Sequence, residues 1–165
     1  MSLAYLSKFG PSFRLHVDRT RPLGEVAAEA GIRLGDGVTE ENFSQPPNAL
    51  SDPAVALVAV GKLGAKPFQL GFSSNCLFIR KIDVLEAMRV QSRVLRVADL
   101  REVIAFAAKF PKEFASGYLS IIFPQVVHPE YGKLCAAYWP QESSISLSQD
   151  LGLMDAELKI LITTA

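Results

Sequence analysis

Residues 99–110 carry the pattern that decides the fold, and they read Asp-Leu-Arg-Glu-Val-Ile-Ala-Phe-Ala-Ala-Lys-Phe. Their apolar residues recur at helical spacing and form one stripe: Leu100, Val103, Ile104 and Ala107. Asp99 stands at the cap position with Glu102 three residues later, which resembles the reciprocal capping box with Asp in place of Ser or Thr. Pro111 ends or kinks the segment. We therefore predict an amphipathic helix over residues 99–110 that buries its apolar stripe.

Strand patterns lie on both sides of this helix. Residues 13–18 alternate between apolar and polar side chains, which is the period of a half-buried strand. Residues 54–60 form a continuous apolar run between Pro53 and Gly61, which is typical of a buried strand. The last third of the chain is rich in β-forming residues, with predicted strands near 118–123, 134–139, 145–149 and 158–163.

Two further helices are expected. Residues 23–30 follow Pro22 and stop at Gly31, and another helix starts at Asp83 with Glu86 three residues later. Together with the strands, these helices predict an α+β fold: a mainly antiparallel sheet with about three helices packed on one face.

The whole chain of 165 residues is expected to be one domain, 1–165, because halves of about 80 residues would each struggle to bury a core. Residues 44–53 contain three prolines, which are incompatible with a helix interior and with a central strand. We interpret them as a surface loop within the domain.

Charge and hydropathy exclude some classes of protein. Lysine and arginine number 17, as do aspartate and glutamate, and this zero net charge excludes a globally basic nucleic-acid binder. It also weakens self-repulsion, so we expect a possible homo-oligomer. No apolar run approaches the roughly 20 residues that cross a bilayer, and the N-terminus lacks the pattern of a signal peptide. A soluble cytoplasmic protein is the expectation.

The two cysteines, Cys76 and Cys135, lie among apolar neighbours and have no metal-like spacing. We expect two buried reduced thiols, while the sequence leaves open a disulfide between them. The two histidines, His16 and His128, are too few for a histidine-rich metal site, and His128 is expected in an exposed turn. No phosphate-binding loop or nucleophile elbow is present, so the sequence predicts no metal and no cofactor.

Candidate catalytic residues lie on the polar face of the first predicted strand. Arg14, His16 and Asp18 are two residues apart and so share a face, which places a histidine between a cation and a carboxylate. A small enzyme using His16 with Asp18 or Arg14 is one hypothesis. The ordinary alternative is that these residues form the solvated side of a strand.

Candidate binding residues come from an arginine-rich stretch, residues 80–101. If the helix starting at Asp83 continues, Arg89, Arg93 and Arg96 share a face that could contact phosphates. Acidic residues interleave with these arginines, so nucleic-acid binding is a weaker hypothesis than a solvated helix face.

Residues 17–25, 38–43 and 95–111 resemble segments of a group of small uncharacterised bacterial proteins. The group combines a strand and short helix, an I-T-x-x-x-F-like segment, and an L-R-E-L-L-A-F-like helix before a β-rich end. Here Phe123-Pro124 departs from the small-residue turn of that group. The resemblance implies a bacterial cytosolic α+β domain and brings no known activity. The sequence shows no set of nucleophile, base and orienting residue and no set of metal ligands. The leading hypothesis is therefore a non-enzymatic binding or interaction module.

Overall fold

The computed structural model of the chain describes residues 3–64, 66, 68–69, 77–91, 95–114, 120–122, 134–149, 153–155 and 158–164. Within them the fold is α+β, which confirms the predicted class. The helices are α1 (Leu3–Leu6), α2 (Leu23–Glu29), α3 (Lys81–Gln91) and α4 (Leu100–Lys109), with 3-10 helices η1 (Val60–Leu63) and η2 (Pro111–Phe114). The strands are β1 (Ser12–Arg14), β2 (Arg33–Leu34), β3 (Ala54–Ala59), β4 (Phe68–Gln69), β5 (Leu77–Arg80), β6 (Leu95–Val97), β7 (Ser120–Ile122), β8 (Leu134–Trp139), β9 (Ser144–Gln149), β10 (Leu153–Asp155) and β11 (Lys159–Thr164).

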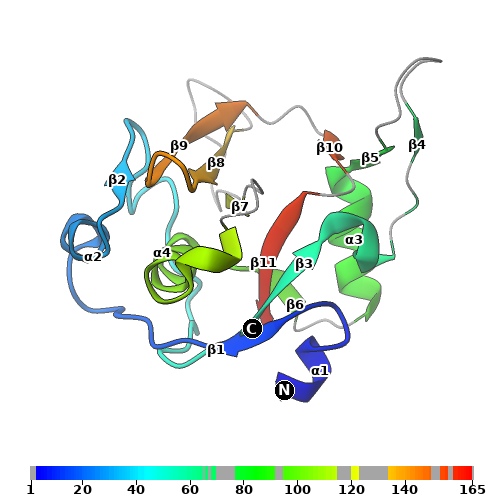
Figure 1. Ribbon diagram of the computed structural model, residues 1–165, viewed down its shortest axis with the longest axis horizontal. Helices are drawn as coiled ribbons and strands as arrows, with labels where there is room; N and C mark the ends of the chain where they lie inside the picture. The colour runs from blue at the N-terminus through cyan, green and yellow to red at the C-terminus, as the bar shows by residue number, and fades with distance from the viewer. Residues whose placement is uncertain are drawn as a thin grey trace.

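The central sheet has the order β1-β3-β11-β6, and all its neighbours are antiparallel. The C-terminal strand β11 lies in the middle, where Ile162 pairs with Ala56 of β3 and with Val97 of β6 (Figure 1). The apolar run that predicted a buried strand is therefore β3, a central strand whose first five residues are all buried.

The central sheet separates two apolar cores. Val55 and Leu57 of β3 belong to the core that includes α2 and α4. Ala56 and Val58, which alternate with them, belong to the core that includes α1 and α3. Figure 1 shows α4 and α3 on opposite sides of β3 and β11.

The helices thus lie on both faces of the central sheet, whereas the sequence analysis placed them on one. The reason is that β3 and β11 carry apolar side chains on both faces, and each face must be covered to keep them from water. A strand that is apolar at consecutive positions needs cover on two sides.

Two smaller sheets flank the central one in the described residues. One has the order β2-β9-β8-β7, with a parallel β2–β9 pair and antiparallel pairing elsewhere. The other has the order β10-β5-β4 and is antiparallel. The strands β7 and β8 lie in the segments predicted as strands near 118–123 and 134–139, and they pair with each other.

The helix ends explain where α2 and α4 begin and stop. The Asp99 carboxylate accepts a hydrogen bond from the backbone N–H of Glu102 at 2.9 Å, and the Glu102 carboxylate accepts one from the backbone N–H of Asp99 at 2.8 Å. The predicted capping box is therefore confirmed. Gly31 adopts a φ of 71° just after α2, a conformation that glycine permits and that stops the helix as predicted.

The helix α3 departs from its predicted limits. It begins at Lys81, two residues before the expected cap Asp83, and ends at Gln91. The Asp83 carboxylate accepts a hydrogen bond from the Nε of Arg80 at 2.6 Å. Asp83 therefore lies in the first turn of the helix, where a negative charge is favoured, and its side chain is held by the residue before the helix.

The proline-rich loop, residues 44–53, is without helix or strand, as predicted, and Arg19 ties it to the domain. Arg19 donates to the carbonyl oxygen of Leu50 at 3.0 Å and to Oε1 of Gln45 at 3.3 Å. The same guanidinium donates to Asp99 at 2.6 Å and to Glu102 at 2.7 Å. One side chain thus joins the loop to the start of α4.

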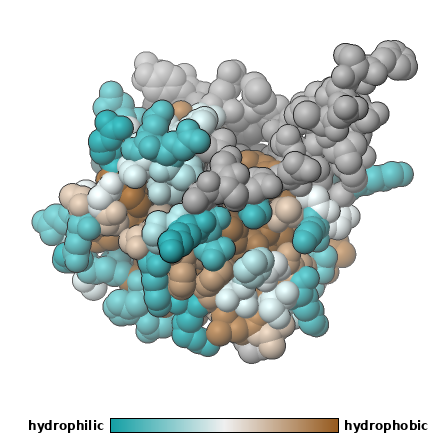
Figure 2. Space-filling view, viewed as in Figure 1, coloured by the Kyte–Doolittle hydropathy of each residue, from teal (hydrophilic) through white to brown (hydrophobic). Residues whose placement is uncertain are grey.

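The described helices include none with the length and apolar character that a membrane span requires. In Figure 2, hydrophilic residues cover much of the visible face, and hydrophobic surface shows in its lower part, over the region of α1.

Candidate functional site

The helix α4 fixes the segment that follows β1 through Arg101. This side chain is only 3% exposed, and its guanidinium donates to the backbone carbonyl oxygens of Asp18 and Arg21, each at 2.9 Å. It also donates to the carboxylate of Glu40. Because two of these acceptors belong to the backbone, Arg101 holds the course of the chain from 18 to 21 against α4.

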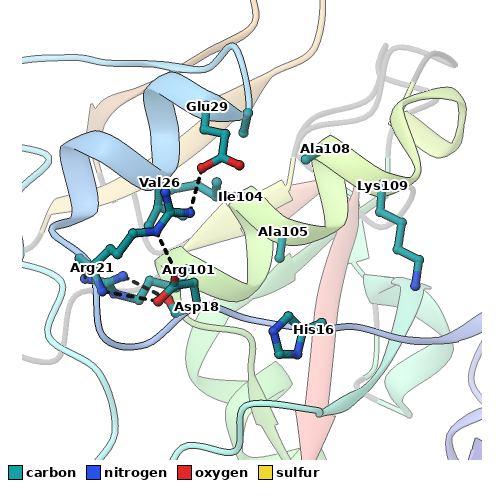
Figure 3. Close-up of a pocket in the computed structure, with 11 residues that line it drawn as sticks. His16, Asp18, Arg21, Val26, Glu29, Arg101, Ile104, Ala105, Ala108 and Lys109 are labelled. Atoms are coloured by element: carbon teal, nitrogen blue, oxygen red, sulfur yellow. Dashed lines mark hydrogen bonds and ion pairs between the residues drawn. The ribbon is translucent and has the colours of Figure 1, made fainter.

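A groove of about 530 Å³ opens between α2, α4 and this segment. Its apolar lining comes from Val26, Ala30, Ile104, Ala105 and Ala108, and three of these are alanines. Its polar lining residues are His16, Asp18, Arg21, Glu29, Arg101 and Lys109. Figure 3 shows Arg21 and Glu29 beside α2, with His16 and Lys109 farther along the groove. The site therefore combines a small-residue floor with charged ends.

At the α2 end, Arg21 bridges two carboxylates. Its Nε donates to Asp18 at 2.7 Å, and its Nη2 lies 2.6 Å from Glu29 (Figure 3). The side-chain hydrogen bond from Arg21, helped by the backbone N–H of Thr20, holds the pKa of Asp18 well below its usual range. The hydrogen bonds from Arg21 to Asp18 and Glu29 in turn raise the pKa of Arg21. Both groups stay charged at neutral pH and are engaged with each other.

At the other end, His16 and Lys109 are positioned by partners outside the groove. The Nδ1 of His16 lies 2.9 Å from Oδ1 of Asp52, and the His16 side chain is 80% exposed. The Nζ of Lys109 donates to the carbonyl oxygen of Arg14 at 3.2 Å and lies 5.4 Å from the ring centre of Phe110. The described residues place no carboxylate within ion-pair distance of Lys109.

The three catalytic candidates of the first strand are only partly brought together. His16 and Asp18 both line the groove, but His16 is directed to Asp52 and Asp18 is held by Arg21. Arg14 is exposed and contributes its backbone carbonyl to Lys109, while its side chain does not line the groove. The regular strand ends at Arg14, although the alternation continues with Leu15 buried.

The arginine face expected on α3 does not form. The helix ends at Gln91, and Arg96 lies in β6, because residues 95–97 pair with β11 instead of continuing the helix. Arg96 donates to the buried carboxylate of Glu102 at 2.7 Å, whereas Arg89 pairs with Glu86 on its own helix. Arg93 lies outside the described residues. The expectation that these arginines share one helix face is therefore wrong.

The sequence analysis did not single out Arg21, Glu29 and Lys109, which line the groove, or Asp52, which contacts His16 from outside it. Arg101 belonged to the arginine-rich stretch 80–101 but was not placed with His16 and Asp18. Arg101 offered one signal, since it is a charged residue next to Leu100 at the start of an apolar helix. Asp52 offered none, because it reaches His16 from 36 residues away.

The remaining candidates are the cysteines and the potential metal ligands. No group of three or more histidine, cysteine, aspartate or glutamate side chains converges there in a way that could hold a metal ion. Cys135 is buried, and its thiol donates to the carbonyl oxygen of Ser148 at 3.6 Å. Cys76 and His128 lie outside the described residues, so the disulfide and turn hypotheses for them stay predictions.

The chain matches no protein-family model, no curated protein and no solved structure.

Proposed function

We propose that this chain is a non-enzymatic binding module whose binding surface is the groove between α2 and α4. The observation that carries the proposal is the pairing of charges around an apolar floor. Arg21 is engaged by Asp18 and Glu29, so the rim holds its charges in place rather than presenting a group that exchanges protons. Concave sites with an apolar lining and a few fixed polar groups are typical of ligand binding.

The enzyme hypothesis has less support from the same residues. A general base must reach its substrate and hold a pKa near the working pH. The Asp18 carboxylate accepts hydrogen bonds from four donors of Arg21 and Thr20, which lower its pKa, so it is a poor proton acceptor at neutral pH. His16 is largely exposed to water, and its described partner is the carboxylate of Asp52.

The nucleic-acid hypothesis also loses its basis. This hypothesis required three arginines to form one basic face, but Arg96 forms an ion pair with Glu102 and Arg89 forms one with Glu86. A surface that binds phosphates through counterion release needs cations that are not already neutralised.

The cellular location and the oligomeric state are proposed from the sequence. We propose that the protein acts in a bacterial cytoplasm, on the basis of its resemblance to small bacterial proteins. Self-association stays a prediction from the zero net charge. A molar mass from light scattering that equals the mass of one chain would contradict self-association.

The test is a ¹H–¹⁵N correlation spectrum recorded with increasing phenylacetamide, a neutral probe with an apolar ring. We expect the shifted resonances to cluster on α2 and α4. Ala108→Trp, at an exposed alanine in the groove lining, should abolish these shifts. Ala28→Trp, at an exposed alanine of α2 outside the lining, is the matched control and should retain them. Shifts that avoid both helices, or that persist in Ala108→Trp, would overturn the proposal.

A further inference from the structure

The groove has the size of a small-molecule site rather than of a broad interface. Its volume of about 530 Å³ falls within the roughly 300–1,000 Å³ of ligand pockets in general. The space exists because Ala30, Ala105 and Ala108 stop at Cβ, while Val26 and Ile104 supply larger apolar contacts. A ligand must therefore bring an apolar body to fill the floor.

The charges that line the groove do not cancel evenly along its length. At the α2 end, Arg21 is matched by Asp18 and Glu29. Arg101 is buried and is matched by Glu40, which lies outside the lining. The charges at this end are therefore paired, so this end does not call for a charged ligand group.

Lys109 is the exception at the other end. Its ammonium group donates to a backbone carbonyl of Arg14 and otherwise faces the ring of Phe110. It takes part in no ion pair with the described residues, and the nearby His16 is directed to Asp52. An exposed cation beside an apolar floor complements an anionic group on an otherwise apolar molecule.

We propose that the ligand of the groove is a small carboxylate with an apolar body, whose carboxylate lies at Lys109 and whose body lies on Ala105 and Ala108. This inference rests on the proposed binding function and adds the chemical class of the ligand. The carboxylate sets the orientation, and the apolar body supplies the contact area. A single positive group matches a monocarboxylate better than a ligand with several negative charges.

The experiment compares phenylacetate with phenylacetamide, which has nearly the same shape and no charge. In titrations followed by ¹H–¹⁵N spectra at low salt, phenylacetate should bind the wild-type protein about two- to fivefold more tightly, the range typical of one exposed ion pair. Lys109→Gln should remove this preference, so that the variant binds both probes with the same affinity. Lys62→Gln is the matched control, because Lys62 is an exposed lysine on η1, beside the core on the other face of the central sheet.

The outcomes separate the two proposals. Equal binding of both probes at the groove, or a preference that survives in Lys109→Gln, overturns the carboxylate inference and leaves the binding module intact. Absence of both probes from the groove overturns both proposals. Acetate that shifts the same resonances as strongly as phenylacetate removes the requirement for an apolar body. A preference for phenylacetate that is lost only in Lys109→Gln supports the inference.

Discussion

The helices α3 and α4 use the same chemical pair, an arginine with a carboxylate, in opposite ways. On α4, Glu102 is 0% exposed and binds Arg19, which comes from 83 residues away. On α3, Glu86 and Arg89 are three residues apart and both are more than half exposed. The first pair joins two segments that are distant in the sequence, whereas the second lies on one solvent-exposed helix face. Burial and chain separation, and not the identity of the pair, decide what a salt bridge does.

Removing the buried carboxylate should have the largest effect. Glu102→Ala leaves Arg19 and Arg96 without their shared acceptor and removes half of the capping box. We expect the free energy of unfolding to fall by about 3–5 kcal/mol, as for a broken buried ion pair. Urea titrations followed by circular dichroism measure it. A loss below about 1 kcal/mol would mean that α4 does not depend on this network.

A core substitution beneath α3 tests whether the second face matters to the fold. Met88→Ala deletes a side chain that is 2% exposed and packs in the core with α1. The expected loss is about 2–5 kcal/mol, the range for a buried methionine changed to alanine. The circular dichroism signals in the near and far ultraviolet should still change in a single transition as urea is increased. Separate transitions would show that the two faces of the central sheet fold independently.

The rim of the groove should contribute to acid sensitivity. The pKa of Asp18 lies below its ordinary value of 3.8, because Arg21 and Thr20 bind the ionised form. Its contribution to stability is therefore complete above pH 3.8 and is lost as the pH falls through the lower folded-state pKa. Asp18→Asn should be less stable than wild type at pH 6, and the difference should shrink on acidification below pH 3.8. A difference that stays constant across this range would contradict the assignment.

The exposed pair on α3 should give the smallest effect. Glu86→Gln removes the partner of Arg89 without disturbing any buried group. The melting temperature at neutral pH should not change measurably, because exposed ion pairs are screened by water. A clear drop in a thermal scan, comparable to that of Glu102→Ala, would remove the contrast between the two helices.

Local patterns in the sequence were enough to predict α4, its capping box and the buried strand β3. Residues 54–59 also indicated that both faces of the sheet are buried, because apolar side chains at consecutive strand positions point to opposite faces. The end of α3 was harder to predict. Residues 95–97 pair with β11 at the far end of the chain, and this sheet pairing overrides a possible helical continuation.

The site was harder to predict than the fold. His16 and Asp18 were identified because they alternate along one strand, but their partners were not. Asp52 meets His16 only after the proline-rich loop folds back, and Lys109 reaches the groove from the last turn of α4. The backbone N–H groups of Leu15 and Val17 donate to the carbonyl oxygens of Pro53 and Ser51, which places Asp52 beside His16. The groove itself depends on how α2 packs against α4, and no local spacing encodes either arrangement.

We propose above all that the groove between α2 and α4 binds an apolar molecule. Intermolecular nuclear Overhauser effects between the ring protons of phenylacetamide and the protein methyl groups test it most directly. We expect contacts with the methyl groups of Ala105 and Ala108, which line the groove. Contacts confined to methyl groups of the opposite core, such as those of Val84 and Leu6, would contradict it.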